Sequence, residues 1–347
     1  MPRSPNRIRT LAAAALLTAA LAALVFAREQ RERAVAPEWP PLAGEVTWSL
    51  LAVGDTGAPP WWIGRSFQQV VRVGRAMAAE DVRRPADALV LLGDNFYPDG
   101  LHARELDARV RANLGEPFCR FLPAPGVPCA TPSRPARVLA VLGNHDHKSD
   151  ESVRLQRTEI RRRLPSFRLP EAPVQTIDLG SQVSIVLYDG VELLAARSFE
   201  PLRAAVRASR GPWRILASHQ PLTLRESDEE GRAAREAIRG LGVPVHLHLA
   251  GHRHYLELAH TSVPPFLQAV AGSGSNTRPL KAPLEGSVYQ ARRPGFARAD
   301  LVTGPDGSRL VVSLVALADS LCDHPEVVAR WSVGLAGDAR AEPLAGR

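Results

Sequence analysis

The sequence of 347 residues predicts an α/β layered fold. Short apolar runs end repeatedly at a glycine or polar corner, and segments with helical character separate them. Runs of this length are too short for helices and are typical of buried strands. Strands that alternate with helices predict layers of helix packed on sheet. With 45% hydrophobic residues, the chain can build a sizeable core, in one large domain or two smaller ones.

The expected elements follow in chain order. Strands are expected at residues 46–53, 88–92, 138–142, 215–217 and 243–250. Helices are expected at about 66–82, 102–114, 151–164, 199–209 and 228–241. Two hairpins are expected over 174–190 and 295–316, with turns at Gly180-Ser181 and at Pro305-Asp306-Gly307. The last 25 residues carry no clear signal.

The composition argues against a nucleic-acid partner. The formal charge is +7, and all of the 43 basic residues are arginines except Lys148 and Lys281. These residues form no cluster interleaved with aromatic side chains and no stripe on an expected helix, as a nucleic-acid-binding surface would require. A mildly positive surface can still attract anionic substrates.

Five of the expected strands end in side chains that bind metals. In chain order these side chains are Asp55, Asp94, Asn144 with His145, His219, and the pair His252 and His254. Ligands in open α/β sheets gather at the carboxyl ends of the strands, so these residues are expected to converge at one edge. Mixed aspartate, asparagine and histidine ligands suit iron, manganese and zinc. Two such ions about 3.5–4 Å apart form a clamp for in-line attack at phosphorus.

These strand ends carry the blocks GDTG (54–57), GDN (93–95), GNHD (143–146), SHQP (218–221) and GHRH (251–254). The series resembles the calcineurin-like metallophosphoesterases, whose first block is Asp-x-His. Here Gly57 stands where histidine is usual, and Tyr97 follows the second block. This coupled change, with VAGSGSN at 270–276, resembles the purple acid phosphatases of the small single-domain, tartrate-resistant type. The resemblance covers residues 48–315 and implies a four-layer αββα sandwich with two central mixed sheets.

The resemblance implies two metal ions. Fe(III) would be held by Asp55, Asp94, Tyr97 and His254, and a divalent iron, zinc or manganese ion by Asp94, Asn144, His219 and His252. Carboxylates and a phenolate are hard, anionic ligands that suit a trivalent ion. The phenolate needs a bound cation, because free tyrosine has a pKa near 10. The alternative for Tyr97 is a core aromatic residue that covers the strand end.

The implied activity is hydrolysis of phosphate monoesters, in small molecules or phosphoproteins, by a metal-bound hydroxide that attacks phosphorus in line. His145 is expected to stabilise the transition state or to protonate the leaving group, and Asp146 to orient His145. A divalent-metal phosphodiesterase with a structural Tyr97 is one alternative. An inactive, envelope-anchored interaction protein is another, which the complete ligand set disfavours. Substrate specificity is expected in residues 58–66 and 222–231, where Trp61 and Trp62 are either a substrate platform or packing residues.

The N-terminus predicts export. Arg3, Arg7 and Arg9 precede an uncharged apolar run at 11–27 that ends in small residues, as in a signal peptide. An uncleaved anchor is the alternative, because a spanning helix needs about 20 residues. The expected organisation is a signal or anchor at 1–27, a linker at 28–45, a catalytic domain at 46–318 and a tail at 319–347. The protein is expected in the periplasm or secreted, and on a membrane only if residues 11–27 are retained.

The three cysteines leave one question open. Cys119 and Cys129 bracket a loop-like stretch and can pair in an oxidising compartment. They can equally be small buried residues. Cys322 is left over near the C-terminus.

Overall fold

The computed structural model describes residues 41–62, 66–129, 136–223, 227–262, 264–317, 325–342 and 344. The expected signal or anchor at 1–27, most of the linker, and Cys322 lie outside these residues. Within the described ranges, no helix combines the length and the apolar character that crossing a membrane requires. The structure joins Cys119 and Cys129 in a disulfide.

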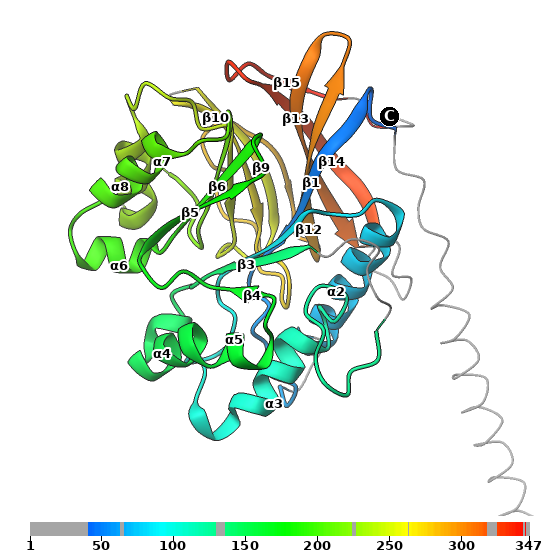
Figure 1. Cartoon of the computed structure of the whole chain (residues 1–347), viewed down its shortest axis with the longest axis vertical. Helices are drawn as coiled ribbons and strands as arrows, with labels where there is room; N and C mark the ends of the chain where they lie inside the picture. The colour runs from blue at the N-terminus through cyan, green and yellow to red at the C-terminus, as the bar shows by residue number, and fades with distance from the viewer. Residues whose placement is uncertain are drawn as a thin grey trace, which may run out of the picture.

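Two mixed sheets form the centre of the molecule (Figure 1). The first has the order β15-β14-β13-β12-β1-β2-β3-β4 and consists of β1 (Glu45–Val53), β2 (Ala88–Leu92), β3 (Arg137–Val141), β4 (Phe167–Arg168), β12 (Gly295–Gly304), β13 (Gly307–Leu317), β14 (Pro325–Gly334) and β15 (Ala339–Ala341). The second has the order β11-β9-β10-β8-β7-β6-β5 and consists of β5 (Val174–Leu179), β6 (Val183–Tyr188), β7 (Trp213–Ala217), β8 (Leu247–Ala250), β9 (Leu256–Ser262), β10 (Pro265–Ala271) and β11 (Ser287–Ala291).

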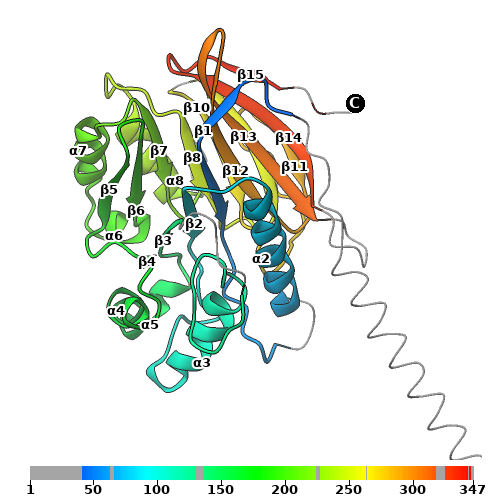
Figure 2. The same cartoon turned by 45° about the vertical axis from the view of Figure 1, so that its right-hand side comes forward.

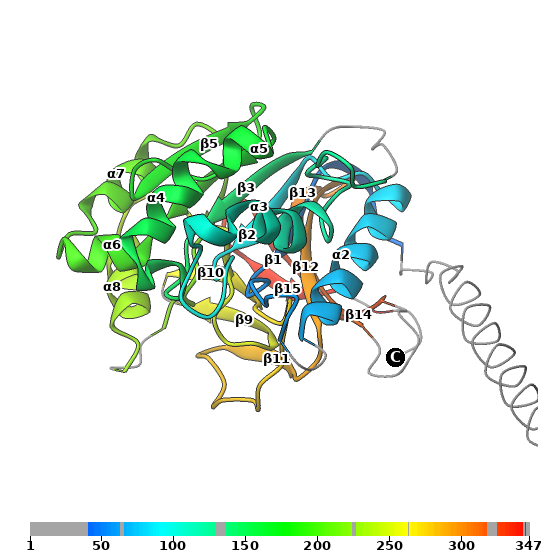
Figure 3. The ribbon, with the colours of Figure 1, turned by 90° about the horizontal axis from the view of Figure 1, so that it is seen from below.

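One apolar core lies between the sheets, and it contains Leu50 and Leu92 of the first with Ile185 and Leu249 of the second. A second core packs helices α2 (Ser66–Arg83), α3 (Leu106–Val110), α4 (Asp150–Thr158) and α5 (Ile160–Arg163) on the outer face of the first sheet. A third packs α6 (Gly190–Ala195), α7 (Glu200–Ala208) and α8 (Glu229–Ile238) on the second sheet. In Figure 2, strands β5 to β8 lie between α7 and α2, and the view from below places α6 and α8 opposite α2 (Figure 3). The predicted α/β sandwich with two central mixed sheets is confirmed.

Several elements differ from the sequence prediction. The expected helix at 102–114 is a 3-10 turn (Ala103–Glu105), the short α3 and a π-turn (Arg111–Gly115). The helix expected at 151–164 is divided into α4 and α5. The strand expected at 243–250 begins only at Leu247, since Pro244 has no N–H to donate to a sheet. Helix α6 and strands β4, β9–β11, β14 and β15 have no counterpart in the prediction, and the first sheet continues beyond residue 318.

Candidate metal centre

The predicted metal ligands all follow the carboxyl ends of strands. Asp55 follows β1, Asp94 follows β2, Asn144 follows β3, His219 follows β7, and His252 and His254 follow β8. Strands β1, β2 and β3 are parallel neighbours in one sheet, and β7 and β8 are parallel neighbours in the other. Backbone hydrogen bonds join the strand ends, including one from the N–H of Asp55 to the carbonyl of Gly93 at 2.9 Å. The topology therefore brings residues from both sheets to one place.

Four ligand atoms form one group, which includes Nε2 of His219. This Nε2 lies 3.1 Å from Oδ1 of Asn144, 3.4 Å from Oδ1 of Asp94 and 3.3 Å from Nδ1 of His252. Nδ1 of His252 is also 3.1 Å from Oδ1 of Asn144. The Nδ1 of His219 lies 2.8 Å from the carbonyl oxygen of Leu92, which accepts a hydrogen bond from it, and Nε2 faces the cluster. This is the group predicted to hold the divalent ion.

A second group adjoins it on the Asp55 side. The Tyr97 hydroxyl donates to Oδ1 of Asp55 at 2.9 Å and lies 3.3 Å from Nε2 of His254. Nε2 of His254 is 3.3 Å from the same Asp55 oxygen. Ligand atoms of Asp55, Asp94 and His219 all lie within 4.8 Å of one another, so the Asp94 carboxylate is close to both groups. The structure thus brings together all seven side chains that the sequence predicts as metal ligands.

Gly57 leaves no room for the side chain that the broader family pattern has at this position. A Cβ added to it would lie 2.6 Å from the backbone N of Phe96 and 2.7 Å from the carbonyl oxygen of Asp94. The N–H of Tyr97 donates to the carbonyl of Gly57 at 2.9 Å, so the two loops are held in close contact. The loop that fills this space is the one that carries Tyr97. Its hydroxyl points into the ligand cluster rather than into the core.

Backbone conformation sets these residues apart. Five non-glycine residues in the described parts of the chain have positive φ, and four of them are Asp55 (58°), Asp94 (52°), His252 (68°) and His254 (50°). The left-handed region is uncommon for residues with a Cβ and costs about 1–3 kcal/mol when the surrounding structure imposes it. Such strain is typical of functional sites. It turns each side chain sharply out of its strand and into the cluster.

The charge of the cluster fits bound cations. Asp55 and Asp94 are buried, and their ion-pair contacts are His254 and His219. In the part of the chain that the structure describes, neither carboxylate pairs with an arginine or lysine. Burial and the nearby charge of Asp94 raise the pKa of Asp55. Burial also disfavours the charged form of Asp94, but the positive charge of His219 outweighs this and lowers its pKa.

The imidazoles are suited to donate electron pairs. Burial lowers the pKa of His252 to about 3 and that of His254 to about 4, so both rings are neutral. Burial opposes a charge on His219 as well, but the Asp94 carboxylate raises its pKa to about 10. A proton on His219 therefore balances the carboxylates, and a metal ion would replace that proton. Carboxylate, amide, imidazole and phenol groups together suit iron, zinc or manganese.

The two predicted catalytic residues have different surroundings. His145 is partly exposed beside the cluster, and its backbone N–H donates to Oδ1 of Asp94 at 2.9 Å. Its ring lies edge-on to the Tyr97 ring, with centroids 4.6 Å apart. In the described residues, no hydrogen bond joins the side chain of Asp146 to that of His145, so the structure offers no direct contact through which Asp146 would orient it. Nδ1 of His145 instead lies 2.5 Å from the carbonyl of Pro98.

Asp146 is wholly buried and binds backbone. Its carboxylate accepts from the N–H groups of Gly143, Asn95 and Phe96 at 2.9–3.1 Å, and from the Gln156 amide at 2.9 Å. It therefore ties the loop after β2 to the loop after β3. Burial raises its pKa to about 6. Its role is to position Asp94 and Asn144 through the loops that carry them.

Sequence reasoning missed Arg109. Its fully buried guanidinium donates to the carbonyls of Gly57 and Tyr97 at 2.9 and 3.0 Å. Asn113, one turn later, donates to the carbonyls of Thr56 and Ala58. Together, Arg109 and Asn113 hold the loops of Asp55 and Tyr97. Both residues lie in the irregular helical segment at 103–115. In the sequence, an arginine in an amphipathic helix gives no such signal.

A second group of potential ligands, His147, Asp189 and Glu192, is an ion-pair network. Nε2 of His147 lies 2.7 Å from Asp189, and Arg157 binds both oxygens of Glu192 at 2.9 Å. Arg157 also lies 3.8 Å from Asp189. The guanidinium of Arg157 already balances the carboxylates of Asp189 and Glu192. This group therefore differs from the predicted metal ligands, whose carboxylates pair with no arginine or lysine in the described residues.

Glu230 is expected to make the stability of the metal-free protein depend on pH. It is 4% exposed, and burial raises its pKa to about 7 from a usual value near 4.5. The unfolded state loses its proton first, so stability falls as pH rises from about 4.5 to 7. Glu230→Gln is expected to raise the free energy of unfolding by up to about 3 kcal/mol at pH 8 and little at pH 4. Urea unfolding at both pH values measures this.

The exposed neighbour Glu229→Gln is the control, because it removes the same charge from the same helix turn. It is expected to change stability by less than about 1 kcal/mol at either pH. An unfolding profile for Glu230→Gln that follows the wild type across this range would contradict the assignment.

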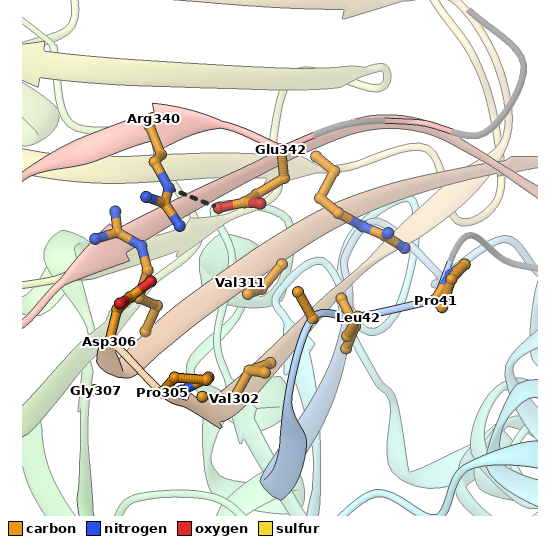
Figure 4. A pocket seen from close by; sticks show the side chains of 13 residues that line it. Pro41, Leu42, Val302, Pro305, Asp306, Gly307, Val311, Arg340 and Glu342 are labelled. Atoms are coloured by element: carbon orange, nitrogen blue, oxygen red, sulfur yellow. Dashed lines mark hydrogen bonds and ion pairs between the residues drawn. The ribbon is translucent and has the colours of Figure 1, made fainter.

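A hollow of about 170 Å³ lies elsewhere, near the amino end of β1 (Figure 4). Its lining includes Pro41, Leu42, Arg309, Arg340 and Glu342. The metal ligands follow the carboxyl end of β1, so this hollow is at the other end of the strand. Arg340 pairs with Glu342 at 3.1 Å along one side of it, and the lining of the hollow has no histidine.

Known proteins resemble this chain in sequence family and in fold. The model of the family described as calcineurin-like phosphoesterase matches residues 49–256, which is more than half of the chain. No curated protein matches the sequence significantly.

Three solved structures share the fold at low sequence identity. GAP50, the anchor in the inner membrane complex of Plasmodium, has a TM-score of 0.58 and 12% identity, with 82% of this chain and 89% of that chain covered. The purple acid phosphatase PPD1 from yellow lupin (Lupinus luteus) seeds has a TM-score of 0.55 and 14% identity, with 83% and 55% covered. PhoD has a TM-score of 0.55 and 12% identity, with 88% and 74% covered. The chain thus spans about half the length of the lupin enzyme.

Proposed function

Because the chain belongs to the calcineurin-like phosphoesterase family, whose members use a dinuclear metal centre, we propose that it is a phosphatase of the purple acid phosphatase type that hydrolyses phosphate monoesters. The observation that carries the proposal is the convergence of seven ligand side chains, with the Tyr97 hydroxyl in the cluster and Gly57 too crowded for a side chain. When bound, two metal ions would supply Lewis-acid charge and lower the pKa of water at the site.

The protein residues have distinct parts in this proposal. The Asp94 carboxylate is close to both ligand groups and would contribute to holding both ions. His145 is partly exposed beside the cluster, where its ring can stabilise charge on the phosphate or give a proton to the leaving oxygen. Asp146 and Arg109 keep the ligand loops in place through buried hydrogen bonds to backbone groups. No covalent phosphoenzyme is needed.

The ligand types favour metal ions of different charge in the two groups. Asp55, Asp94, Tyr97 and His254 offer two carboxylates and a phenol, which favour Fe(III). Asp94, Asn144, His219 and His252 offer one carboxylate with neutral amide and imidazole groups, which favour divalent iron, zinc or manganese. Burial and the charges of Asp55 and Asp94 raise the pKa of Tyr97 well above 10, so only a strongly charged cation would displace its proton.

The substitution Tyr97→Phe tests whether the protein is a phosphatase of the purple acid phosphatase type. The iron-loaded protein is expected to be purple to pink from phenolate-to-Fe(III) charge transfer, and Tyr97→Phe is expected to lose that colour. Its affinity for Fe(III) should fall on the order of 100-fold, since even outer partners of metal ligands change affinity 10–100-fold. Visible spectra and metal analysis measure both effects.

Tyr188→Phe is the matched control, because Tyr188 is also buried but its hydroxyl lies near His248 and, in the described part of the chain, bonds to no predicted metal ligand. It is expected to keep the colour. A colourless protein that is fully active with zinc or manganese alone would contradict the tyrosinate assignment. An activity screen over phosphate monoesters and diesters decides the substrate class.

Location and organisation extend the proposal. We propose export to the periplasm or secretion through residues 1–27, with inner-membrane anchoring if residues 11–27 are retained. The catalytic domain, proposed at 46–318, would include residues up to 341, because β14 pairs with β13 and β15 pairs with β14. The proposed substrates are small-molecule or phosphoprotein esters, and no nucleic-acid partner is proposed.

A further inference from the structure

We infer that Trp61 and Trp62 form an aromatic platform beside the metal centre that binds a ring in the organic part of the substrate. The protein would then prefer phosphate esters that carry an aromatic group over those that carry a short alkyl group. This inference rests on the proposed function, because it concerns the organic group of the phosphate ester that the same site would bind.

The exposure of these two side chains needs an explanation. Trp61 is 55% exposed and Trp62 is 37% exposed. Among the described residues, the other exposed large hydrophobic side chains are single ones: Val82, Leu280, Val288 and Leu335. An indole ring has a large apolar surface, and leaving it in water forgoes the gain from burial. Two adjacent exposed indoles next to a ligand cluster therefore point to a binding surface.

Both rings are supported from behind by buried residues. The Trp62 ring stacks on Tyr97, with centroids 6.0 Å apart and planes at 22°. The Trp61 ring lies over the guanidinium of Arg109 at 5.0 Å from the ring centroid. Tyr97 and Arg109 are 3% and 0% exposed, and Arg109 also binds the Tyr97 carbonyl. The indoles are thus held in place while the surface away from these anchors is open to solvent.

The platform lies where the substrate must project. The Tyr97 ring that supports Trp62 also contacts His145, and its hydroxyl reaches the Asp55 carboxylate. Trp62 is therefore one ring away from the ligand cluster. Asn144, His145 and His252 are the partly exposed members of the site, so solvent reaches the cluster from their side. A phosphate held by the ligands would direct its ester group outward on this side, near Trp62.

An aromatic occupant is favoured over an alkyl one. Aromatic rings stack on an indole face at centroid distances of 4.5–7 Å, and this attraction adds to simple area burial. Stacking on aromatic side chains is also tolerant of the detailed structure of the ring. The phosphate tethers the ring near the indole, so little additional entropy is lost.

The test uses two esters with similar leaving groups. 2-Phenylethyl phosphate and propyl phosphate are both esters of primary alcohols, so they differ chiefly in the ring. The metal-loaded wild type is expected to have a higher kcat/KM for the phenylethyl ester. Trp62→Ala is expected to lower that value about tenfold and to leave propyl phosphate almost unchanged. Trp62→Phe should retain most of the preference, and the distant Leu335→Ala should retain all of it.

Binding of the matching phosphonates, measured by calorimetry, repeats the comparison without turnover. Equal losses for both compounds in Trp62→Ala would show that Trp62 only packs on Tyr97 and would overturn the inference, as would a wild type without preference. If the wild type hydrolyses neither ester, the proposed function fails, and the ratio of phosphonate affinities still decides whether the platform exists. The metal content of each variant confirms that the Tyr97 loop is intact.

Discussion

Asp94→Asn is expected to lower kcat/KM for phosphate esters by about 10³-fold or more. The Asp94 carboxylate is close to both ligand groups, and its Oδ1 is 3.4 Å from Nε2 of His219. Asparagine removes the negative charge that both ions would share, which is worth several kcal/mol of charge stabilisation. Its side-chain oxygen can still accept the N–H of His145, as Asp94 does at 2.9 Å, so the loop is expected to keep its shape. Steady-state kinetics and metal analysis of the purified variant measure the effect.

The same substitution at Asp99 is the control. Asp99 lies five residues further along the same loop, is exposed, and pairs with Lys148 at 3.2 Å on the surface. Asp99→Asn is expected to leave activity within about twofold, since exposed ion pairs contribute little. If Asp94→Asn bound two metal ions and kept activity within tenfold of the wild type, Asp94 would not be the bridging ligand.

The layered fold could be predicted because its central strands are short, apolar and bounded by turn residues. Strands β1, β2 and β3 agree with the predicted ranges to within one residue at each end. Strands β9–β11 were not predictable in the same way. They form the far side of the second sheet, beyond β8, and a long glycine- and proline-containing segment separates β11 from β10. The pairing of β10 with β8 and of β11 with β9 places them in the sheet, and strand propensity depends strongly on such context.

The ligand positions could be predicted because each stands directly after a strand, where parallel topology fixes its place. The supporting residues could not. Asp146 stands beside His145 in the sequence, but its carboxylate binds backbone N–H groups from two loops 51 and 3 residues away. Arg109 reaches the carbonyl of Gly57 across 52 positions. Such contacts depend on three-dimensional loop paths, and a single sequence carries no local pattern for them.

The sequence and the structure both link Gly57 with Tyr97. The missing histidine at position 57 predicts that another residue completes the first ligand group. The structure adds a physical reason why the two positions change together, because the backbone before Tyr97 occupies the space that a side chain at position 57 would need. A histidine ligand at 57 and this path of the Tyr97 loop are therefore mutually exclusive.

Gly57→Ala is accordingly expected to destabilise the protein by about 3 kcal/mol and to impair metal retention. The added Cβ would lie 2.6–2.7 Å from three backbone atoms of Asp94 and Phe96, which cannot move without displacing a ligand or the Tyr97 loop. Overpacking of this kind typically costs 1–3 kcal/mol, and these neighbours are backbone atoms rather than flexible side chains. Denaturant unfolding and iron content measure the two effects.

Gly304→Ala is the matched control, because its nearest neighbour would be a single carbonyl oxygen at 3.3 Å, and it is expected to change stability by less than 1 kcal/mol. Gly57→His in the Tyr97→Phe background distinguishes exclusion from simple crowding. If the two positions were interchangeable, the new histidine would restore metal binding to the colourless variant. We expect no restoration and a further loss of stability, since the path of residues 94–96 leaves no space for an imidazole whichever ring stands at position 97. Restored metal binding with wild-type stability would show that the loop can move away and that Gly57 does not require Tyr97.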